Sequence, residues 1–328
     1  LHSFPTRRSS DLYLDIFYQT KELLRELMEI PEEYEILFMH GGATAQFASV
    51  PLNLMKTGKA DYIVTGNFSK KAAEEAAKYG QVSIIYDDKE NGYTSIPSMD
   101  QLHFHEDASY VHICSNNTIY GTEWHSYPDT GDIPLVADMS SDILSHPVNV
   151  RDFGLIYAGA QKNMGIAGLA VVIVRKDLLG SPKENTPVIF RYDIEAKNDS
   201  MYNTPSCYSI YVLGKMLEWL KKMGGVRKME ELNQKKAALL YDYLDQSDYY
   251  IPHAAKDARS LMNVTFTTPD PETDSEFARR AAECGLVNLK GHRLVGGIRA
   301  SIYNAMPIEG VEKLIAFMDQ FALEKKNA

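Results

Sequence analysis

Two charged residues, each next to an apolar run, are the first candidates for chemistry. Lys162 lies in a loop of small residues between two runs typical of buried strands. A lysine in such surroundings is partly desolvated, which lowers the pKa of its amine and suits it to imine formation with an aldehyde. Asp138 directly follows another apolar run earlier in the chain. Taken singly, these residues also fit a solvated surface lysine and an aspartate that caps a helix.

Taken together, Asp138 and Lys162 form the pair that pyridoxal phosphate (PLP) requires. The aspartate keeps the pyridine nitrogen protonated, and the lysine holds the aldehyde as an imine. The turn at residues 40–42, His-Gly-Gly, precedes a helix-like stretch from Ala43 and offers free N–H groups to a phosphate. The same turn also fits a tight strand-to-helix connection that binds nothing. It matches neither the dinucleotide fingerprint nor the P-loop, so a nucleotide-binding module is least favoured.

A second basic group lies near the C-terminus. His292, Arg293 and Arg299 are close in sequence and flanked by glycines in a chain of net charge −10. Arginine suits carboxylates and phosphates because its planar fork bonds them in a bidentate manner. These residues indicate an anionic substrate, and the alternative is a solvated basic loop.

Composition excludes several classes of protein. The 34 Lys and Arg against 44 Asp and Glu in 328 residues disfavour a nucleic-acid binder. The three cysteines, at 114, 207 and 284, are too far apart to predict a disulfide framework or a zinc site, and they favour a reducing compartment. No metal site is expected. The longest apolar run in the middle of the chain, residues 169–174, is too short to cross a membrane.

The elements that must position these residues are strands alternating with helices. Continuous apolar runs predict strands covered on both faces, as in a mostly parallel sheet of an α/β protein. The predicted strands are 34–38, 61–64, 82–86, 110–114, 135–137, 155–158 and 169–174.

Helices are predicted from residue 13 to before Pro31 and at 43–55, 69–79 (capped by Ser69), 206–223, 226–244, 274–283 and 307–322. Strands at 262–266 and 298–302 indicate a second, α+β unit. We therefore expect a large domain over 13–225 and a small C-terminal domain over 226–328. Residues 1–12 are rich in Ser and Arg and lack periodicity, so we interpret them as a non-native or disordered head that replaces a missing N-terminus.

Several segments carry a resemblance to a known family. HGGATAQFASVPLNLM, NNTIYG, VADMSSDILS, IYAGAQKNMGIAG and KGHRLVGGIRASIYNAMPIEGV resemble the phosphoserine aminotransferases, class-V PLP enzymes of fold type I. The resemblance covers the chain from about residue 13 to its end. It implies a large domain with a seven-stranded, mostly parallel sheet, a small C-terminal α+β domain and a cytoplasmic homodimer.

The resemblance also implies a reaction. Such enzymes move the amine of L-glutamate to 3-phosphohydroxypyruvate, which gives O-phospho-L-serine for serine biosynthesis and 2-oxoglutarate. The family also acts on 4-phosphohydroxythreonine in pyridoxine (PLP) biosynthesis.

Roles follow for the matching positions. Lys162 would be the Schiff-base lysine and proton shuttle, and Asp138 would face the pyridine nitrogen. The other implied cofactor contacts are Thr118 at the ring hydroxyl or aldehyde, Phe68 on the ring face where the family usually has Trp, Ala43, Thr44 and Gln161 at the phosphate, and Asn203 and Thr204 at the phosphate of the neighbouring subunit. Arg299 would clamp the substrate α-carboxylate, and His292 with Arg293 its phosphate.

The sequence departs from the family at two places. The Ser-His-Arg segment that helps to bind substrate is replaced by the head, whose Arg7 and Arg8 do not match it, and Thr44 stands where some members have Arg. The alternatives that stay open are another fold-type I enzyme and a fragment that holds PLP without turnover. A desulfurase is one such fold-type I enzyme, and it would need a reactive loop cysteine.

Overall fold

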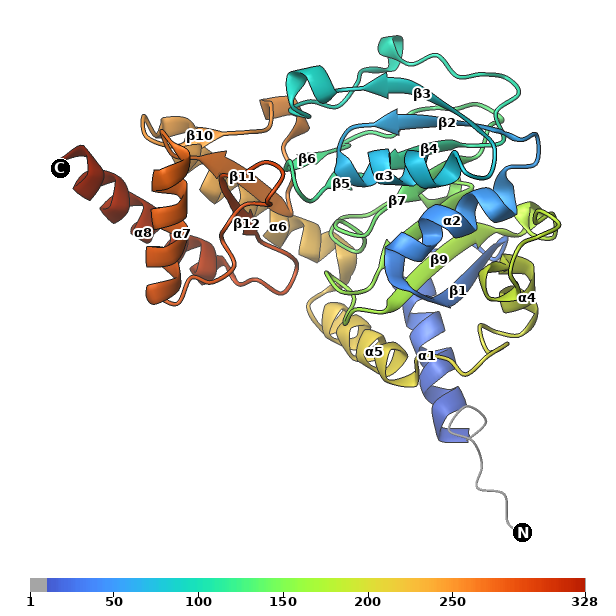
Figure 1. The fold of residues 1–328 in the computed structure, drawn as a ribbon. Helices are drawn as coiled ribbons and strands as arrows, with labels where there is room; N and C mark the ends of the chain where they lie inside the picture. Colours follow the sequence, from blue (N-terminus) through green and yellow to red (C-terminus); the bar gives the residue numbers. More distant parts are fainter. Residues whose placement is uncertain (1–10, 328) are drawn as a thin grey trace.

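A seven-stranded sheet forms the centre of the large part of the molecule (Figure 1). The computed structural model describes residues 11–327. The strands are β1 (Tyr34–His40), β2 (Lys59–Val64), β3 (Gln81–Asp87), β4 (Val111–Cys114), β7 (Leu135–Asp138), β8 (Leu155–Gly159) and β9 (Leu169–Arg175), in the order β1-β9-β8-β7-β4-β2-β3. The pairing makes all of them parallel except β9, which runs antiparallel to both β8 and β1. All seven predicted strands are confirmed, with ends shifted by one or two residues.

Apolar residues on both faces of the strands explain why the sheet is buried. In β1, Ile36 and Phe38 join a core with one set of helices, whereas Leu37 and Met39 join a core on the opposite face. Successive side chains of a strand point to opposite faces, so a continuous apolar run contributes to two cores at once. The prediction of a sheet covered on both sides is therefore confirmed.

The covering helices divide between these two faces. The helices of the large part are α1 (Asp11–Leu27), α2 (Gly42–Leu54), α3 (Asn67–Ala76), α4 (Tyr192–Lys197) and α5 (Cys207–Lys222). Residues of α1 and α5 share one core, and those of α2, α3 and α4 share the other. Figure 1 shows α2 and α3 in front of the sheet and α1 beside α5 below it.

Two details of the helix predictions were wrong. Ser69 does not cap α3 at its first position, because Gly66 does. The Ser69 hydroxyl instead accepts hydrogen bonds from the backbone N–H groups of Thr65 and Gly66 from within the first turn. The second detail is α4, which was not predicted.

The C-terminal part has its own sheet and core. Strands β10 (Ile251–Pro252), β11 (Asn263–Thr267) and β12 (Ile298–Ser301) form an antiparallel sheet that packs with α6 (Gly225–Gln246), α7 (Pro271–Glu283) and α8 (Ile308–Lys326). The first turn of α6 packs on the large core through Val226 and Met229, and its later residues join the C-terminal core. We keep residue 226 as the proposed start of a small domain.

A short hairpin joins the two parts. Strands β5 (Asn116–Asn117) and β6 (Thr122–Glu123) follow β4 and lie next to β11 (Figure 1). Asn116 donates to the Asn263 side chain at 2.9 Å, and the Leu261 N–H donates to Glu123 at 2.7 Å. These contacts tie the loop beyond β4 to the C-terminal part. In residues 11–327 no helix is long and apolar enough to span a bilayer.

Candidate active site

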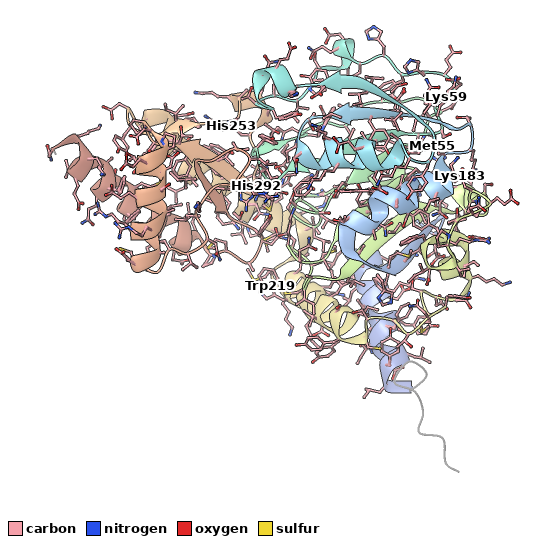
Figure 2. All side chains as sticks on the ribbon, in the orientation of Figure 1. Met55, Lys59, Lys183, Trp219, His253 and His292 are labelled. Carbon is pink, nitrogen blue, oxygen red and sulfur yellow. The ribbon has the colours of Figure 1, made fainter. Side chains whose placement is uncertain are left out.

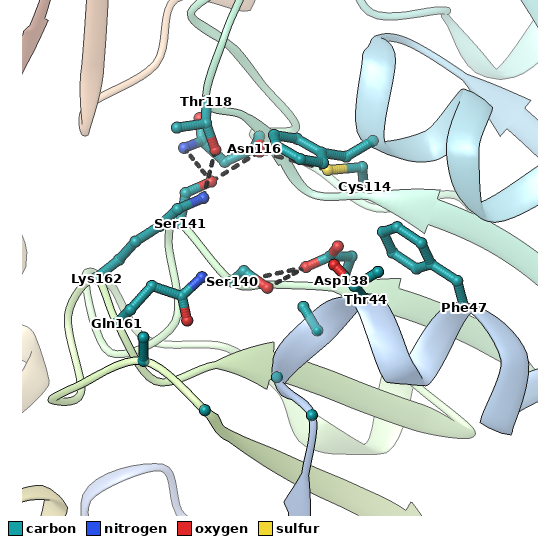
Figure 3. A pocket seen from close by; sticks show the side chains of 16 residues that line it. Thr44, Phe47, Cys114, Asn116, Thr118, Asp138, Ser140, Ser141, Gln161 and Lys162 are labelled. Atoms are coloured by element: carbon teal, nitrogen blue, oxygen red, sulfur yellow. Dashed lines mark hydrogen bonds between the residues drawn. The ribbon is translucent and has the colours of Figure 1, made fainter. Parts of the chain in front are cut away.

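A cavity of about 260 Å³ opens where the parallel strands end (Figure 3). The loops that follow β1, β4, β7 and β8, together with the start of α3, provide its walls. Its lining residues are Gly41, Gly42, Ala43, Thr44, Phe47, Phe68, Cys114, Asn116, Thr118, Asp138, Ser140, Ser141, Gln161, Lys162, Ala167 and Gly168. Open α/β sheets bind their ligands at this edge, outside the carboxyl ends of the strands. The structure therefore brings the predicted lysine, aspartate and glycine-rich turn to one place.

Lys162 lies in the loop after β8 and reaches toward the β5–β6 hairpin. Its Nζ donates a hydrogen bond to the Thr118 hydroxyl at 2.6 Å (Figure 3). Burial lowers the pKa of this amine, while the negative charge of Asp138 acts in the opposite direction. Burial outweighs the attraction, so Lys162 is closer to a neutral nucleophile than a surface lysine is.

Asp138 is the last residue of β7 and is only 4% exposed. Its Oδ1 accepts hydrogen bonds from the Ser140 N–H at 2.9 Å and from the Ser140 hydroxyl at 2.5 Å. Burial raises the pKa of the carboxyl, and the bonds from Ser140 and the charge of Lys162 oppose that rise. The residues after Asp138 form a turn, so the alternative reading of a helix cap is wrong.

The glycine-rich turn presents the start of α2 to the same cavity. Gly41 adopts a left-handed conformation with φ of 90°, and a Cβ there would lie 2.6 Å from that of Ala45. The N–H groups of Ala43 and Thr44 are in the first turn of the helix, where backbone donors have no partner within the helix. The turn thus leaves donors and the positive end of the helix dipole facing the cavity, as an anion requires.

Phe68 and Gln161 complete the walls. The Lys162 Nζ is 5.6 Å from the centre of the Phe68 ring. Aromatic pairs stack with ring centres about 4.5–7 Å apart, so a flat ring that stacked on Phe68 would lie near the amine. Gln161 lies beside Lys162 in the lining, and its contact with a cofactor phosphate stays a prediction.

None of the predicted substrate cations is in the lining of the cavity, but Arg299 lies at its rim, where it contacts the lining residue Thr118, and its charge acts on His292. Arg299, on β12, donates from Nη1 to the Thr118 carbonyl at 3.4 Å, and its buried Nε has no partner. His292 lies on the side of the C-terminal part that faces the large sheet (Figure 2). Burial lowers the pKa of His292 first, and the charges of Arg299 and Arg293 lower it further. The three basic side chains therefore act on one region, with a guanidinium that is largely free to bind an anion.

Two predicted cofactor residues do not reach the cavity of their own chain. Asn203 and Thr204 are not among the described lining residues, and the Thr204 carbonyl accepts a hydrogen bond from His40 at 3.2 Å. Their expected role across a subunit boundary stays a prediction. Arg7 and Arg8 lie outside the described residues.

Several lining residues were missed by the sequence reasoning. They are Phe47, Cys114, Asn116, Ser140, Ser141, Ala167 and Gly168. Ser140 could have been found, because a hydroxyl two residues after a strand-ending aspartate is well placed to bond back to it. Asn116 gave no such signal, since its buried position depends on the hairpin and on Asn263.

A group of potential metal ligands, not predicted from the sequence, lies nearby. Ligand atoms of Glu123, Asp142 and His146 are all within 4.8 Å of one another. The Leu261 N–H and the Ser115 hydroxyl already bond one oxygen of each carboxylate, at 2.7 and 2.6 Å. Burial raises the pKa of both carboxyls. A retained proton and these hydrogen bonds account for the group, and we assign no metal to it.

Comparison with known proteins agrees with this geometry. The Aminotransferase class-V family matches residues 5–314. A phosphoserine aminotransferase of Bacillus cereus is 51% identical over 318 residues, which cover 97% of this chain and 88% of that protein. One of Nitrosomonas europaea is 52% identical over 325 residues, which cover 96% and 88%. The chain belongs to the phosphoserine aminotransferase family.

Solved structures of phosphoserine aminotransferases have the same fold. The enzyme from Bacillus circulans subsp. alkalophilus has a TM-score of 0.95 at 41% identity, over 98% of this chain and 89% of that one. A PLP-bound phosphoserine aminotransferase from Trichomonas vaginalis has a TM-score of 0.92 at 36% identity, over 96% and 90%. The fold-type I prediction is therefore confirmed. An aspartate aminotransferase from Thermus thermophilus, 19% identical with a TM-score of 0.79 over 98% and 94%, shares the fold alone.

Proposed function

We propose that the chain is a PLP-dependent transaminase. It moves the amine of L-glutamate to 3-phosphohydroxypyruvate and releases 2-oxoglutarate and O-phospho-L-serine. The observation that carries the proposal is that Lys162 and Asp138 line one cavity beside a helix start with free N–H groups. The phosphoserine aminotransferases at about half identity over most of the chain point to the same reaction.

The chemistry of the lining fits PLP. The first-turn N–H groups of Ala43 and Thr44, with Gln161, would hold the phosphate, and Phe68 would cover one face of the ring. Ser140 donates only to Oδ1 of Asp138, and Oδ2 would face the pyridine nitrogen. When bound, PLP supplies an electron sink for the bonds at the substrate α-carbon.

Lys162 handles the proton. An amine whose pKa is lowered by burial can take a proton from the substrate α-carbon and return it at the cofactor end. The hydrogen bond that the amine donates to the Thr118 hydroxyl fixes it at one side of the cavity. Loss of the Asp138 charge would lower the pKa of Lys162 further, so one carboxylate serves both the ring and the base.

The basic residues at the rim would hold the substrate. Arg299, with its unpartnered Nε, is the clamp for the α-carboxylate that both amino donor and acceptor carry. His292 and Arg293 would bind the group at the other end of the substrate, a carboxylate in glutamate and a phosphate in the acceptor; the charges of Arg293 and Arg299 both act on His292.

Further features support a homodimer in a reducing compartment such as the cytoplasm. Tyr202 and Tyr208 are 50% and 70% exposed next to Asn203 and Thr204, an apolar surface that a second copy would cover. The three cysteines are unpaired, as in reducing surroundings. The same anion-binding residues suit 4-phosphohydroxythreonine, so a second role in pyridoxine biosynthesis is part of the proposal.

The test is a coupled assay of glutamate with 3-phosphohydroxypyruvate, run beside an absorbance scan of the purified holoenzyme. We expect a visible cofactor band and formation of 2-oxoglutarate that depends on the phosphorylated acceptor. A cofactor band without turnover would favour the inactive fragment. Turnover with pyruvate or oxaloacetate but not with the phosphorylated acceptor would favour another transaminase of this fold.

A further inference from the structure

A second hollow adjoins the cavity on the other side of Phe68. Thr44, Phe47 and Phe68 line both spaces, and the second one measures about 360 Å³. It continues along α3, where Lys71 lies one helical turn beyond Phe68. Residues three apart on a helix share a face, so Lys71 and Phe68 project to the same side of α3.

Lys71 differs from its neighbours in having no acidic partner. Glu74 and Glu75 line the same hollow, but Glu74 pairs with Lys70 at 3.8 Å and Glu75 pairs with Lys78. Within residues 12–327, no carboxylate forms an ion pair with Lys71. The positive charge on this face of α3 is therefore not neutralised by the helix that carries it.

The charge of Lys71 also acts on the basic loop at the rim. It acts on His292 together with the charges of Arg293 and Arg299. In the described chain, none of these four basic side chains is paired with an acid. Like charges held together in this way repel one another, which costs stability unless an anionic ligand joins them.

We propose that Lys71 is a specificity-determining residue that attracts the phosphate end of the amino acceptor. The inference rests on the proposed function. A phosphate carries a charge of about −1.5 to −2 at neutral pH, whereas the side-chain carboxylate of glutamate carries one charge. An added cation therefore favours the phosphorylated acceptor over glutamate. Lys71 would approach the phosphate of the substrate from α3, whereas His292 and Arg293 would approach it from the loop before β12.

The experiment compares three variants of the holoenzyme. Lys71→Gln removes the charge, Lys71→Arg keeps it, and Lys70→Gln removes an equal charge from the adjacent residue that pairs with Glu74. KM is measured for 3-phosphohydroxypyruvate and for glutamate, and inorganic phosphate is titrated calorimetrically as a probe of the distal anion site. All are exposed or half-exposed helix positions, so the fold is retained.

We expect Lys71→Gln to raise KM for the phosphorylated acceptor about 3- to 10-fold, the range for loss of one partly screened charge. The affinity of Lys71→Gln for inorganic phosphate should fall in parallel, and its KM for glutamate should change by less than about 2-fold. Both KM values of Lys71→Arg should stay near those of wild type. Equal effects of Lys71→Gln and Lys70→Gln would overturn the inference. If wild type does not turn over the phosphorylated acceptor, the proposed function fails first, and the phosphate titration still decides the role of Lys71.

Discussion

Arg299→Ala should weaken both substrates of the reaction. Its Nε is buried without a partner, and its Nη1 makes only a 3.4 Å hydrogen bond to the Thr118 carbonyl. The guanidinium would therefore give up little hydrogen bonding within the protein when it binds a ligand. Both glutamate and the phosphorylated acceptor carry a carboxylate next to the reacting carbon. A clamp on that shared group must therefore act on both half-reactions.

The magnitude follows from the fork geometry. Two charge-assisted hydrogen bonds to a partly buried carboxylate contribute about 1.5–3 kcal/mol each, and together about 3–5 kcal/mol because paired contributions are not fully additive. At about 1.4 kcal/mol per factor of ten, kcat/KM should fall about 100- to 3,000-fold for each substrate. Because the clamp also positions the α-carbon over Lys162, kcat falls together with the rise in KM.

Steady-state kinetics of each substrate, at saturation of the other, measure the two losses separately. Arg299→Lys keeps the charge without the fork and should lie between wild type and Arg299→Ala. Lys290→Ala removes an equal charge from an exposed nearby position and serves as the control. A loss confined to the phosphorylated acceptor, or a loss as small as that of Lys290→Ala, would refute the assignment of the clamp.

Two further predictions concern the buried carboxyls. Asp138→Asn keeps the bonds from Ser140 but cannot pair with a protonated pyridine nitrogen, so PLP affinity and kcat should each fall about 10- to 100-fold; a PLP titration that matches wild type contradicts this. Burial raises the pKa of Glu123 in the folded chain, so unfolding releases a proton and the folded state loses stability as pH rises above the ordinary pKa of glutamate. The free energy of unfolding of Glu123→Gln, relative to wild type, should therefore increase by about 1–3 kcal/mol from pH 5 to pH 8 in urea denaturation. A difference in unfolding free energy between Glu123→Gln and wild type that decreases from pH 5 to pH 8 would contradict the raised pKa of Glu123.

Local pattern predicted the elements well because burial on both faces leaves a clear mark. The run from Leu169 to Val174 is apolar at every position, and such a run must be a strand between two helix layers. Its antiparallel direction, however, depends on the short Lys162 loop, which returns the chain at the same edge of the sheet. Order and direction arise from tertiary packing, which the spacing of apolar residues does not encode.

In the candidate site, too, some residues could be predicted from the sequence and others depend on tertiary contacts. Lys162 and Asp138 each follow a strand, so a parallel sheet had to bring them to one edge. Asn116 and Ser141 could not be found by that argument, because a hydrogen bond of 2.9 Å between their side chains and the contact of Asn116 with the C-terminal part place them. Lys71 was also missed, since the sequence shows neither its lack of an ion pair nor the effect of its charge on His292, and these two features distinguish it from Lys70.

The most direct test of the whole account is to find which lysine carries the cofactor. The holoenzyme is reduced with sodium borohydride and digested, and mass spectrometry locates the modified residue. We predict modification of Lys162, and loss of both the label and the visible band in Lys162→Ala. Burial lowers the pKa of Lys236 to about 8, which makes it the competing amine. A label on Lys236, with Lys162 unmodified, would contradict the account.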